Sequence, residues 1–256
     1  MRVRDARLRY TGAWLLPAIG LLFSTVAYAG AGVWTSGGPY GGEIRALAIN
    51  PASPGTVYAG TYEGGVFKST DSGGTWAAAS TGLTNPDIRA VVINPVIPTT
   101  LYAGTYGGGV FKSIDSGHTW SVTGLTNLNV RALAINSATP GTLYAGTDGG
   151  GAFKSTDSGG TWATANTGLT NQRVNSLAVN LATPATLYAG TYGGGVFKST
   201  DSGGTWAAAN TGLTNQQVNS LAINFSTPAT LYAGTEGGVF KSINSCLLYT
   251  SPSPRD

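Results

Sequence analysis

A short segment, Leu or Val followed by Tyr-Ala-Gly-Thr, recurs five times along the chain. Successive tyrosines of this segment are 44, 42, 44 and 44 residues apart, and each segment is followed closely by Phe-Lys-Ser. A fixed period of this length indicates copies of one supersecondary unit, which cannot bury its apolar face without its neighbours. The fold is therefore limited to repeat architectures. The repeated tyrosines are Tyr58, Tyr102, Tyr144, Tyr188 and Tyr232.

Each repeat contains four candidate strands, which in the first copy cover residues 44–50, 56–61, 65–69 and 75–79. They are rich in β-branched and aromatic residues, and Gly, Pro, Asn, Asp and Ser separate them. No stretch has helical periodicity. Four strands in about 44 residues predict an all-β fold, a β-propeller of four-stranded antiparallel blades. A β-solenoid, which usually has shorter rungs, is the alternative. The predicted units are 44–79, 88–123, 130–165 and 174–209, with a fifth, three-stranded unit at 218–243.

The first strand of each repeat alternates small and large residues. In the first copy Ala46 and Ala48 alternate with Leu47 and Ile49. Small side chains suit the crowded innermost strand of a propeller, and we expect the larger ones to fill the space between blades.

The first 29 residues are predicted to be a cleaved signal peptide. Four arginines lie in the first nine residues, an apolar stretch covers 13–26, and Ala27-Tyr28-Ala29 fits a cleavage site. The alternative is an uncleaved membrane anchor, but the apolar run is short for a span. We expect a secreted or periplasmic protein with no membrane span in the mature chain.

The last eleven residues, 246–256, match nothing upstream and resemble a translated sequencing-library adapter. A native disordered tail is the alternative. We therefore expect the propeller to occupy residues 30–245, to be truncated at its C-terminal end, and to exclude 246–256 from its fold. A strand near 33–35 is expected to complete the fifth blade, because Trp34 matches a tryptophan that the fifth copy lacks. An open arc in which this strand stays unpaired is the alternative.

Charge and composition exclude several classes of function. Residues 30–245 contain nine basic and nine acidic residues, so their net charge is zero and no nucleic-acid footprint remains. They contain no cysteine, which excludes disulfides and thiol chemistry. The single histidine, His118, is expected to be a surface residue, and no metal-ligand spacing or cofactor motif is present.

Four complete copies of Ser-x-Asp-Ser-Gly-x-Thr-Trp, at 69–76, 113–120, 155–162 and 199–206, resemble the Asp-box, or bacterial neuraminidase repeat. Sialidases, xyloglucanases, sortilin-type receptors and photosystem II assembly-factor propellers carry this box. The resemblance implies a β-propeller and leaves the function open, because all these families share the box. An identical Asp in every blade is expected to cap its turn, and the Trp to anchor it by packing, with no catalytic or metal-binding role. These residues are Asp71, Trp76, Asp115, Trp120, Asp157, Trp162, Asp201 and Trp206.

Positions that vary between copies are expected to gather on the face opposite the boxes. There the loops that enter the first strand and those that join the second and third strands form a mouth. Arginine forks match carboxylates, and tyrosine rings stack on sugars or peptides, so an anionic or carbohydrate ligand would fit. Solvated loop charges without a ligand are the alternative. The candidate mouth residues are Arg45, Arg89, Arg131, Tyr62, Glu63, Tyr106, Asp148, Tyr192 and Glu236.

These residues favour a secreted, non-catalytic binding scaffold, monomeric, with a protein or carbohydrate partner and no catalytic residue assigned. The alternative is a glycoside hydrolase of sialidase or xyloglucanase type, most simply exo-sialidase-like. Such an enzyme needs two carboxylates about 5–10 Å apart, and the acids outside the boxes are few. They are Glu43, Glu63, Asp87, Asp148 and Glu236.

Overall fold

The computed structural model describes residues 37–39, 42–126, 128–243 and 248–250. The chain divides into two units, Met1–Ser36 and Gly37–Asp256, and all described residues belong to the second. The predicted signal peptide and the predicted strand at 33–35 lie outside the described residues. Within the described part, no helix is long and apolar enough to cross a membrane.

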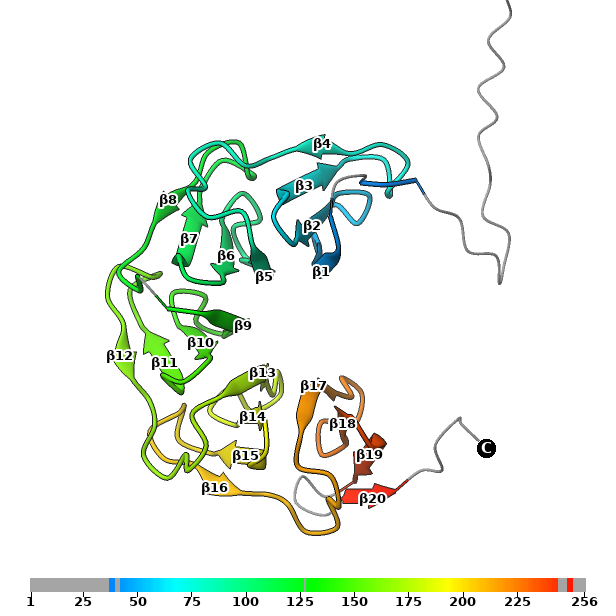
Figure 1. The fold of residues 1–256 in the computed structure, drawn as a ribbon, viewed down its shortest axis with the longest axis vertical. Coiled ribbons are helices and arrows are strands. Elements are labelled where there is room, and N and C mark those ends of the chain that lie inside the picture. The colour runs from blue at the N-terminus through cyan, green and yellow to red at the C-terminus, as the bar shows by residue number, and fades with distance from the viewer. Residues whose placement is uncertain (1–36, 40–41, 127, 244–247, 251–256) are drawn as a thin grey trace, which may run out of the picture. The chain divides into compact units, whose positions relative to one another are not determined.

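The described residues form five antiparallel sheets of four strands each, which confirms the β-propeller (Figure 1). The first blade comprises β1 (Ile44–Ile49), β2 (Val57–Thr61), β3 (Gly65–Ser69) and β4 (Ala77–Ala78). The second comprises β5 (Ile88–Ile93), β6 (Leu101–Thr105), β7 (Gly109–Ser113) and β8 (Ser121–Val122). The third comprises β9 (Val130–Ile135), β10 (Leu143–Thr147), β11 (Ala152–Ser155) and β12 (Ala163–Thr164). The fourth comprises β13 (Val174–Val179), β14 (Leu187–Thr191), β15 (Gly195–Ser199) and β16 (Ala207–Ala208). The fifth comprises β17 (Val218–Ile223), β18 (Leu231–Thr235), β19 (Gly238–Ser242) and β20 (Leu248–Thr250).

Within each sheet the strands follow sequence order, so the first strand of each repeat is innermost and the fourth is outermost. The inner three strands lie within two residues of their predicted bounds. The outer strand is shorter than predicted: in the first blade only Ala77 and Ala78 pair with β3. The preceding residues are instead taken up by the box turn described below.

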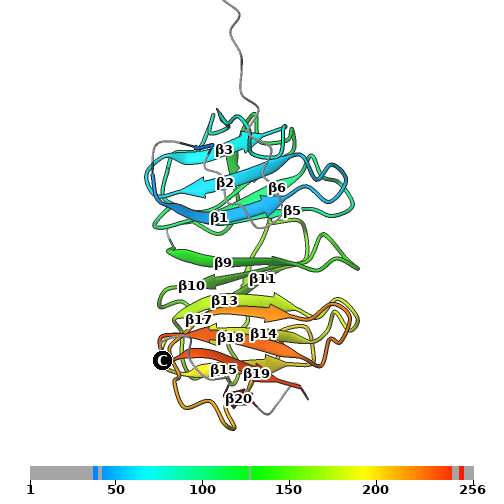
Figure 2. The same ribbon diagram turned by 90° about the vertical axis from the view of Figure 1, so that its right-hand side faces the viewer.

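Neighbouring blades fit together through a glycine of each second strand. The inner strands β1, β5, β9, β13 and β17 pack in succession, as Figure 2 also shows edge-on. A Cβ at Gly104 of β6 would lie 2.6 Å from the Cγ1 of Val130 on the next blade. The same close approach joins Gly60 to Ile88, Gly146 to Val174 and Gly190 to Val218. The glycine of Tyr-Ala-Gly-Thr is thus required by contact between blades, where any larger residue would clash.

A buried tyrosine adds a polar link across the same contact. The hydroxyl of Tyr58 and the ammonium of Lys68 both donate to the backbone oxygen of Ser116 in the next blade, each at 3.1 Å. Tyr102 and Lys112 bind the oxygen of Ser158 in the same way. Burial raises the pKa of Tyr58 and of Tyr102, so the phenols remain neutral donors.

The expectation that large inner-strand residues fill the space between blades is wrong for the first blade. Leu47 is 66% exposed, whereas its equivalent Val91 on β5 is 6% exposed. The reason is that β1 packs against β5 on one side only, and no described strand covers its other side.

The fifth sheet also corrects the prediction. Its fourth strand, β20, comes from the segment 246–256 that was expected to stay outside the fold. Phe240, Lys241 and Ser242 of β19 pair with Thr250, Tyr249 and Leu248. Without β20, the backbone N–H and C=O groups on the outer edge of β19 would be unpaired. The pairing with β20 provides their hydrogen-bond partners.

Candidate functional site

The five inner strands begin at one hollow of about 230 Å³. Its lining contains four arginines, two asparagines and one tyrosine, and no acidic residue. The structure therefore brings together the three arginines that the sequence predicted for the mouth. The lining residues are Arg45, Arg89, Arg131, Arg173, Asn175, Tyr192 and Asn219.

A β-bulge at the start of each inner strand places these side chains. In β5 the pairing jumps from Ile88 to Ala90, so Arg89 is the extra residue without a partner on β6. The same jump leaves Arg45, Arg131, Asn175 and Asn219 unpaired in their strands. A bulge turns its extra side chain out of the regular alternation. The bulge thus directs one residue of every blade into the hollow.

Each arginine of the first three blades is held by a carboxylate. Arg89 donates from Nε and Nη2 to the two oxygens of Asp87, both at 2.8 Å, and this pairing raises the pKa of Arg89. Arg45 pairs with Glu43 at 2.6 Å.

Asp148 is shared by two arginines. One of its oxygens accepts from Arg131 at 2.6 Å, and the other lies 3.3 Å from the Nε of Arg173. The Nε of Arg173 is buried and makes no hydrogen bond. Arg173 is therefore placed by the ion pair and by its contact with Tyr192, 4.1 Å from the ring centroid.

Tyrosine rings contact the guanidinium groups of the first two blades. The ring centroid of Tyr62 lies 5.7 Å from Arg45 and 5.9 Å from Arg89, and that of Tyr106 lies 4.9 Å from Arg89. A hydrogen bond to Glu63 raises the pKa of Tyr62. The backbone of Tyr106 bridges to Asn129 of the following blade, which ties the two sets of mouth loops together.

The predicted mouth residues thus separate into three groups. Arg45, Arg89, Arg131 and Tyr192 line the hollow, while Tyr62, Tyr106 and Asp148 hold its arginines. Glu63 lies in an exposed turn at φ 60°, and Glu236 faces the side-chain amide of Gln217; neither lines the hollow.

Arg173, Asn175 and Asn219 were missing from the predicted site. Their columns are visible in the aligned repeats, but neither the bulge that places Asn175 and Asn219 nor the ion pair that places Arg173 has a sequence signal.

The Asp-box residues lie in the turns between third and fourth strands and form the same network in each complete copy. Asp71 accepts from the backbone N–H of Thr75 at 2.8 Å and from its hydroxyl at 2.7 Å. Ser69 donates to Asp71 at 2.7 Å and accepts from the N–H of Gly73, which has φ of 90°. The carboxylate is therefore occupied within its own turn. Asp115, Asp157 and Asp201 make the same contacts.

These contacts predict acid sensitivity. The bond from the backbone N–H of Thr75 is the first cause that lowers the pKa of Asp71 from 3.8 to about 2, and Asp157 and Asp201 behave alike. A folded-state pKa below the unfolded value adds stability that is present above about pH 4 and is lost as the pH falls toward about 2. We expect the melting temperature to fall over this range in a pH series followed by circular dichroism. Asp157→Asn should lower the melting temperature at neutral pH and flatten the acid decline, and an equally steep decline would contradict this role.

The box tryptophans differ between blades, which the identical motif did not predict. Trp120 and Trp206 are buried, and their ring N–H groups donate to Ala79 and Ala165 of the preceding blade, each at 2.8 Å. Trp76 and Trp162 are half-buried and donate to Gly73 and Gly159 of their own turns.

The length of the preceding linker explains the difference for Trp162. The linker after Trp120 is two residues shorter than those after Trp76 and Trp162, which accounts for the single 42-residue spacing. In this linker Gly124 donates to Gly159, whereas Thr81 in the longer linker accepts from the backbone N–H of Trp120.

Trp120→Phe should therefore destabilise the protein more than Trp76→Phe. It removes a buried hydrogen bond and packing volume, worth together about 2 kcal/mol, whereas Trp76 has no contact of this kind with another blade. Urea unfolding of the two variants checks this, and equal midpoints would contradict the distinction.

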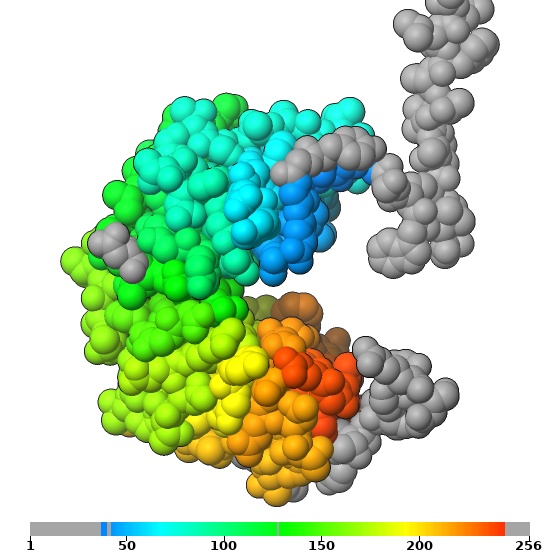
Figure 3. Space-filling model, in the orientation of Figure 1, coloured from blue at the N-terminus to red at the C-terminus, as the bar shows by residue number. Residues whose placement is uncertain are grey.

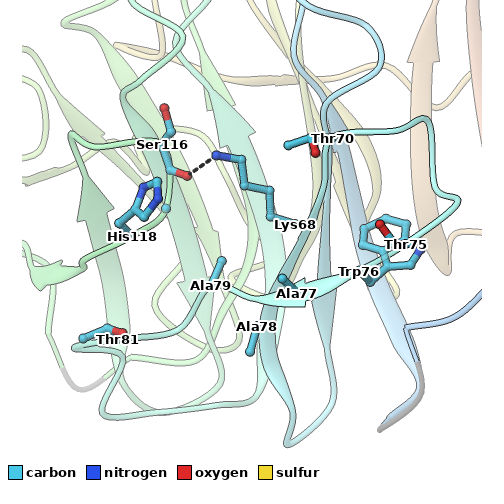
Figure 4. Close-up of a pocket in the computed structure, with 11 residues that line it drawn as sticks. Lys68, Thr70, Thr75, Trp76, Ala77, Ala78, Ala79, Thr81, Ser116 and His118 are labelled. Atoms are coloured by element: carbon cyan, nitrogen blue, oxygen red, sulfur yellow. Dashed lines mark hydrogen bonds between the residues drawn. The ribbon is translucent and has the colours of Figure 1, made fainter.

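Half-buried Trp76 borders a groove of about 420 Å³ between the first two blades (Figure 4). The side chains of Lys68 and His118 at the groove already have partners within the protein. Lys68 reaches across it to Ser116, and the ring of His118 contacts the backbone oxygen of Asp115 at 2.5 Å. Over 42–126 and 128–243, no cluster of three His, Cys, Asp or Glu is placed to hold a metal ion.

Comparison with known proteins shows which of them share this fold. No family model matches the chain. A xyloglucanase of Hypocrea jecorina (strain QM6a) is 50% identical over 44 residues, 17% of this chain and 5% of that protein. The GH74 xyloglucanase from Xanthomonas campestris superposes with a TM-score of 0.66 at 19% identity, over 80% of this chain and 37% of the enzyme. YCF48 bound to D1 peptide superposes with a TM-score of 0.57 at 16% identity, over 78% and 63% of the two chains. The chain spans less than two thirds of each of these proteins, and at this identity the structural likeness shows the fold alone: this chain has the β-propeller fold that they share.

Proposed function

We propose that this protein is an exported, non-catalytic propeller that binds an anionic ligand at the hollow where its inner strands begin. The observation that carries the proposal is the convergence of four arginines on a hollow whose lining has no acidic residue. Their carboxylate partners lie outside that lining, so the guanidinium groups are oriented before a ligand arrives. Export rests on the predicted signal peptide.

The neutral side of the hollow narrows the chemistry of the ligand. Asn175 donates from Nδ2 to the backbone oxygen of Val218, while its Oδ1 is buried without a partner. The buried amide therefore adds no charge to the hollow, and the arginines remain the groups that would bind a carboxylate. Peptides with acidic side chains and acidic sugars both carry carboxylates, and Tyr192 offers a ring for either to stack upon.

The comparisons are compatible with a binding role. One of the similar structures, YCF48, was solved with a peptide bound. Its likeness to this chain concerns the fold, so it supports a peptide as one ligand class to test.

A glycoside hydrolase is the second candidate, favoured by the 44-residue match to a xyloglucanase. Three of the five acids outside the boxes argue against it, because Glu43, Asp87 and Asp148 each hold a guanidinium group. A carboxylate committed in this way is poorly placed to attack or to transfer a proton to a sugar.

The test is isothermal titration of the whole protein with four probes: hexaglutamate, sialyllactose, hexalysine and a neutral xyloglucan oligosaccharide. We expect binding of at least one of the two acidic probes, weakened by added salt, and none of hexalysine. Release of sugar from xyloglucan or sialyllactose would support the hydrolase instead. Failure of both acidic probes to bind would leave the mouth charges as solvated loop charges and contradict the proposal.

A further inference from the structure

The two ends of the row of blades expose surfaces that are buried everywhere else in it. On the first blade Ile44 is 40% exposed, whereas its equivalents Ile88, Val130, Val174 and Val218 are fully buried. On the fifth blade Val239 is 49% exposed, whereas Val66, Val110 and Val196 are fully buried. We call the surface of Ile44, Leu47 and Ile49 the leading face, and that of Tyr232, Gly234 and Val239 the trailing face.

The four contacts between blades show what each face accepts. In every contact, a β-branched residue at the start of one inner strand covers the glycine of the preceding blade. Gly190 is covered in this way by Val218, whereas the nearest atoms to a Cβ at Gly234 belong only to Ser220 of its own blade. Among the described residues, no side chain of a following blade therefore covers Gly234. Ile44 is equivalent to the covering residues, but it has no glycine of a preceding blade to cover.

The polar part of the contact is present on the trailing face as well. Lys241 lies 5.9 Å from the ring of Tyr232, as Lys68 lies 5.6 Å from the ring of Tyr58. In the first blade this pair binds the box serine oxygen of the next blade. The trailing face thus carries the apolar and the polar halves of a blade contact.

The two faces do not cover each other. The inner strand β1 packs against β5, and β17 packs against β13, but β1 and β17 do not pack against each other as neighbouring inner strands do. The space-filling view shows an opening between the first and fifth blades (Figure 3). We infer that both faces are docking faces for further four-stranded blades of this same repeat, which would fill the opening. The partner is thus defined by its chemistry: a β-branched residue toward Gly234, and a glycine toward Ile44.

Occupation of these faces would also affect the mouth. Arg45 of the first blade and Asn219 of the fifth line the hollow from its two ends. Added blades would stand between them, and their bulge residues would complete the lining.

The test continues the chain from residue 242 with its own repeat sequence, which replaces residues 243–256 and therefore β20. Residues 1–242 are followed by 200–217 and then by one, two or three copies of 174–217, which continues the repeat in register. Gly234→Val should shift the urea midpoint little in the original chain. With one added copy it should cost as much as Gly190→Val does, because Gly234 is then covered. Ile44→Asp should be mild in the original chain and as costly as Ile88→Asp at the copy number that closes the ring.

Hydrogen exchange of β18 and β19 provides a readout independent of the substitutions, with protection expected to rise on the first added copy. Unchanged protection, a Gly234→Val effect that stays mild at every length, or added copies that remain unfolded by circular dichroism would each overturn the inference. A dimer of the original chain by sedimentation equilibrium, abolished by Ile44→Asp, would overturn it in favour of a second copy.

Discussion

Gly104→Val is expected to lower the free energy of unfolding by about 3 kcal/mol, a large part of the stability of a domain of this kind. The added Cβ would lie 2.6 Å from Val130 and 3.4 Å from Leu133, and both side chains are buried between two blades. Neither can withdraw without opening the contact. Equilibrium urea unfolding followed by circular dichroism measures the loss.

Gly234→Val is the matched control, because this glycine has the same place in its repeat and no neighbouring blade over it. We expect a change below about 0.5 kcal/mol, as for surface substitutions. Equal losses at the two positions would show that the glycine matters within its own sheet and not between blades.

Replacing Arg45, Arg89 and Arg131 together by Asn is expected to weaken binding of the acidic probe at least about 100-fold while the protein stays folded. At about 1.4 kcal/mol per tenfold change this is about 3 kcal/mol, spread over three charge-assisted contacts. Asn is tolerated in this bulge, because Asn175 and Asn219 occupy it in the fourth and fifth blades. Titration calorimetry at about 0.15 M salt measures the loss.

The opposite substitution serves as the control. Asn219→Arg places a fifth guanidinium group at the same bulge position and should tighten binding of the acidic probe. If the triple variant binds as the original chain does, the arginines are bystanders. If it unfolds, they are structural.

The repeat predicted the strands because its period aligns five copies of each one, and turn residues separate them. The contacts between copies were harder to predict. The period does not reveal that Gly104 makes room for Val130, or that a two-residue deletion turns Trp162 away from the preceding blade.

Only part of the candidate site could be predicted, because the aligned copies reveal equivalent positions and not the contacts between blades. One position of the repeat varies between copies, and in the first three copies it holds Arg45, Arg89 and Arg131. This variation is why the sequence predicted them. Arg173 belongs to a different column and reaches the hollow through the shared carboxylate of Asp148. Bulges and ion pairs across blades depend on tertiary packing, which one repeat read alone cannot supply.

The most direct measurement of the central claim is an NMR titration of the arginine Nε–H groups with the acidic probe that binds. Residues 30–256 contain five arginines, and all but Arg255 line the hollow, so nearly every such signal reports on it. We predict that the signals of Arg45, Arg89, Arg131 and Arg173 shift together and saturate at one affinity, while the lysine signals of the outer grooves stay in place. Shifts confined to Lys68 and its equivalents, with the arginine signals unmoved, would contradict the claim that the mouth is the binding site.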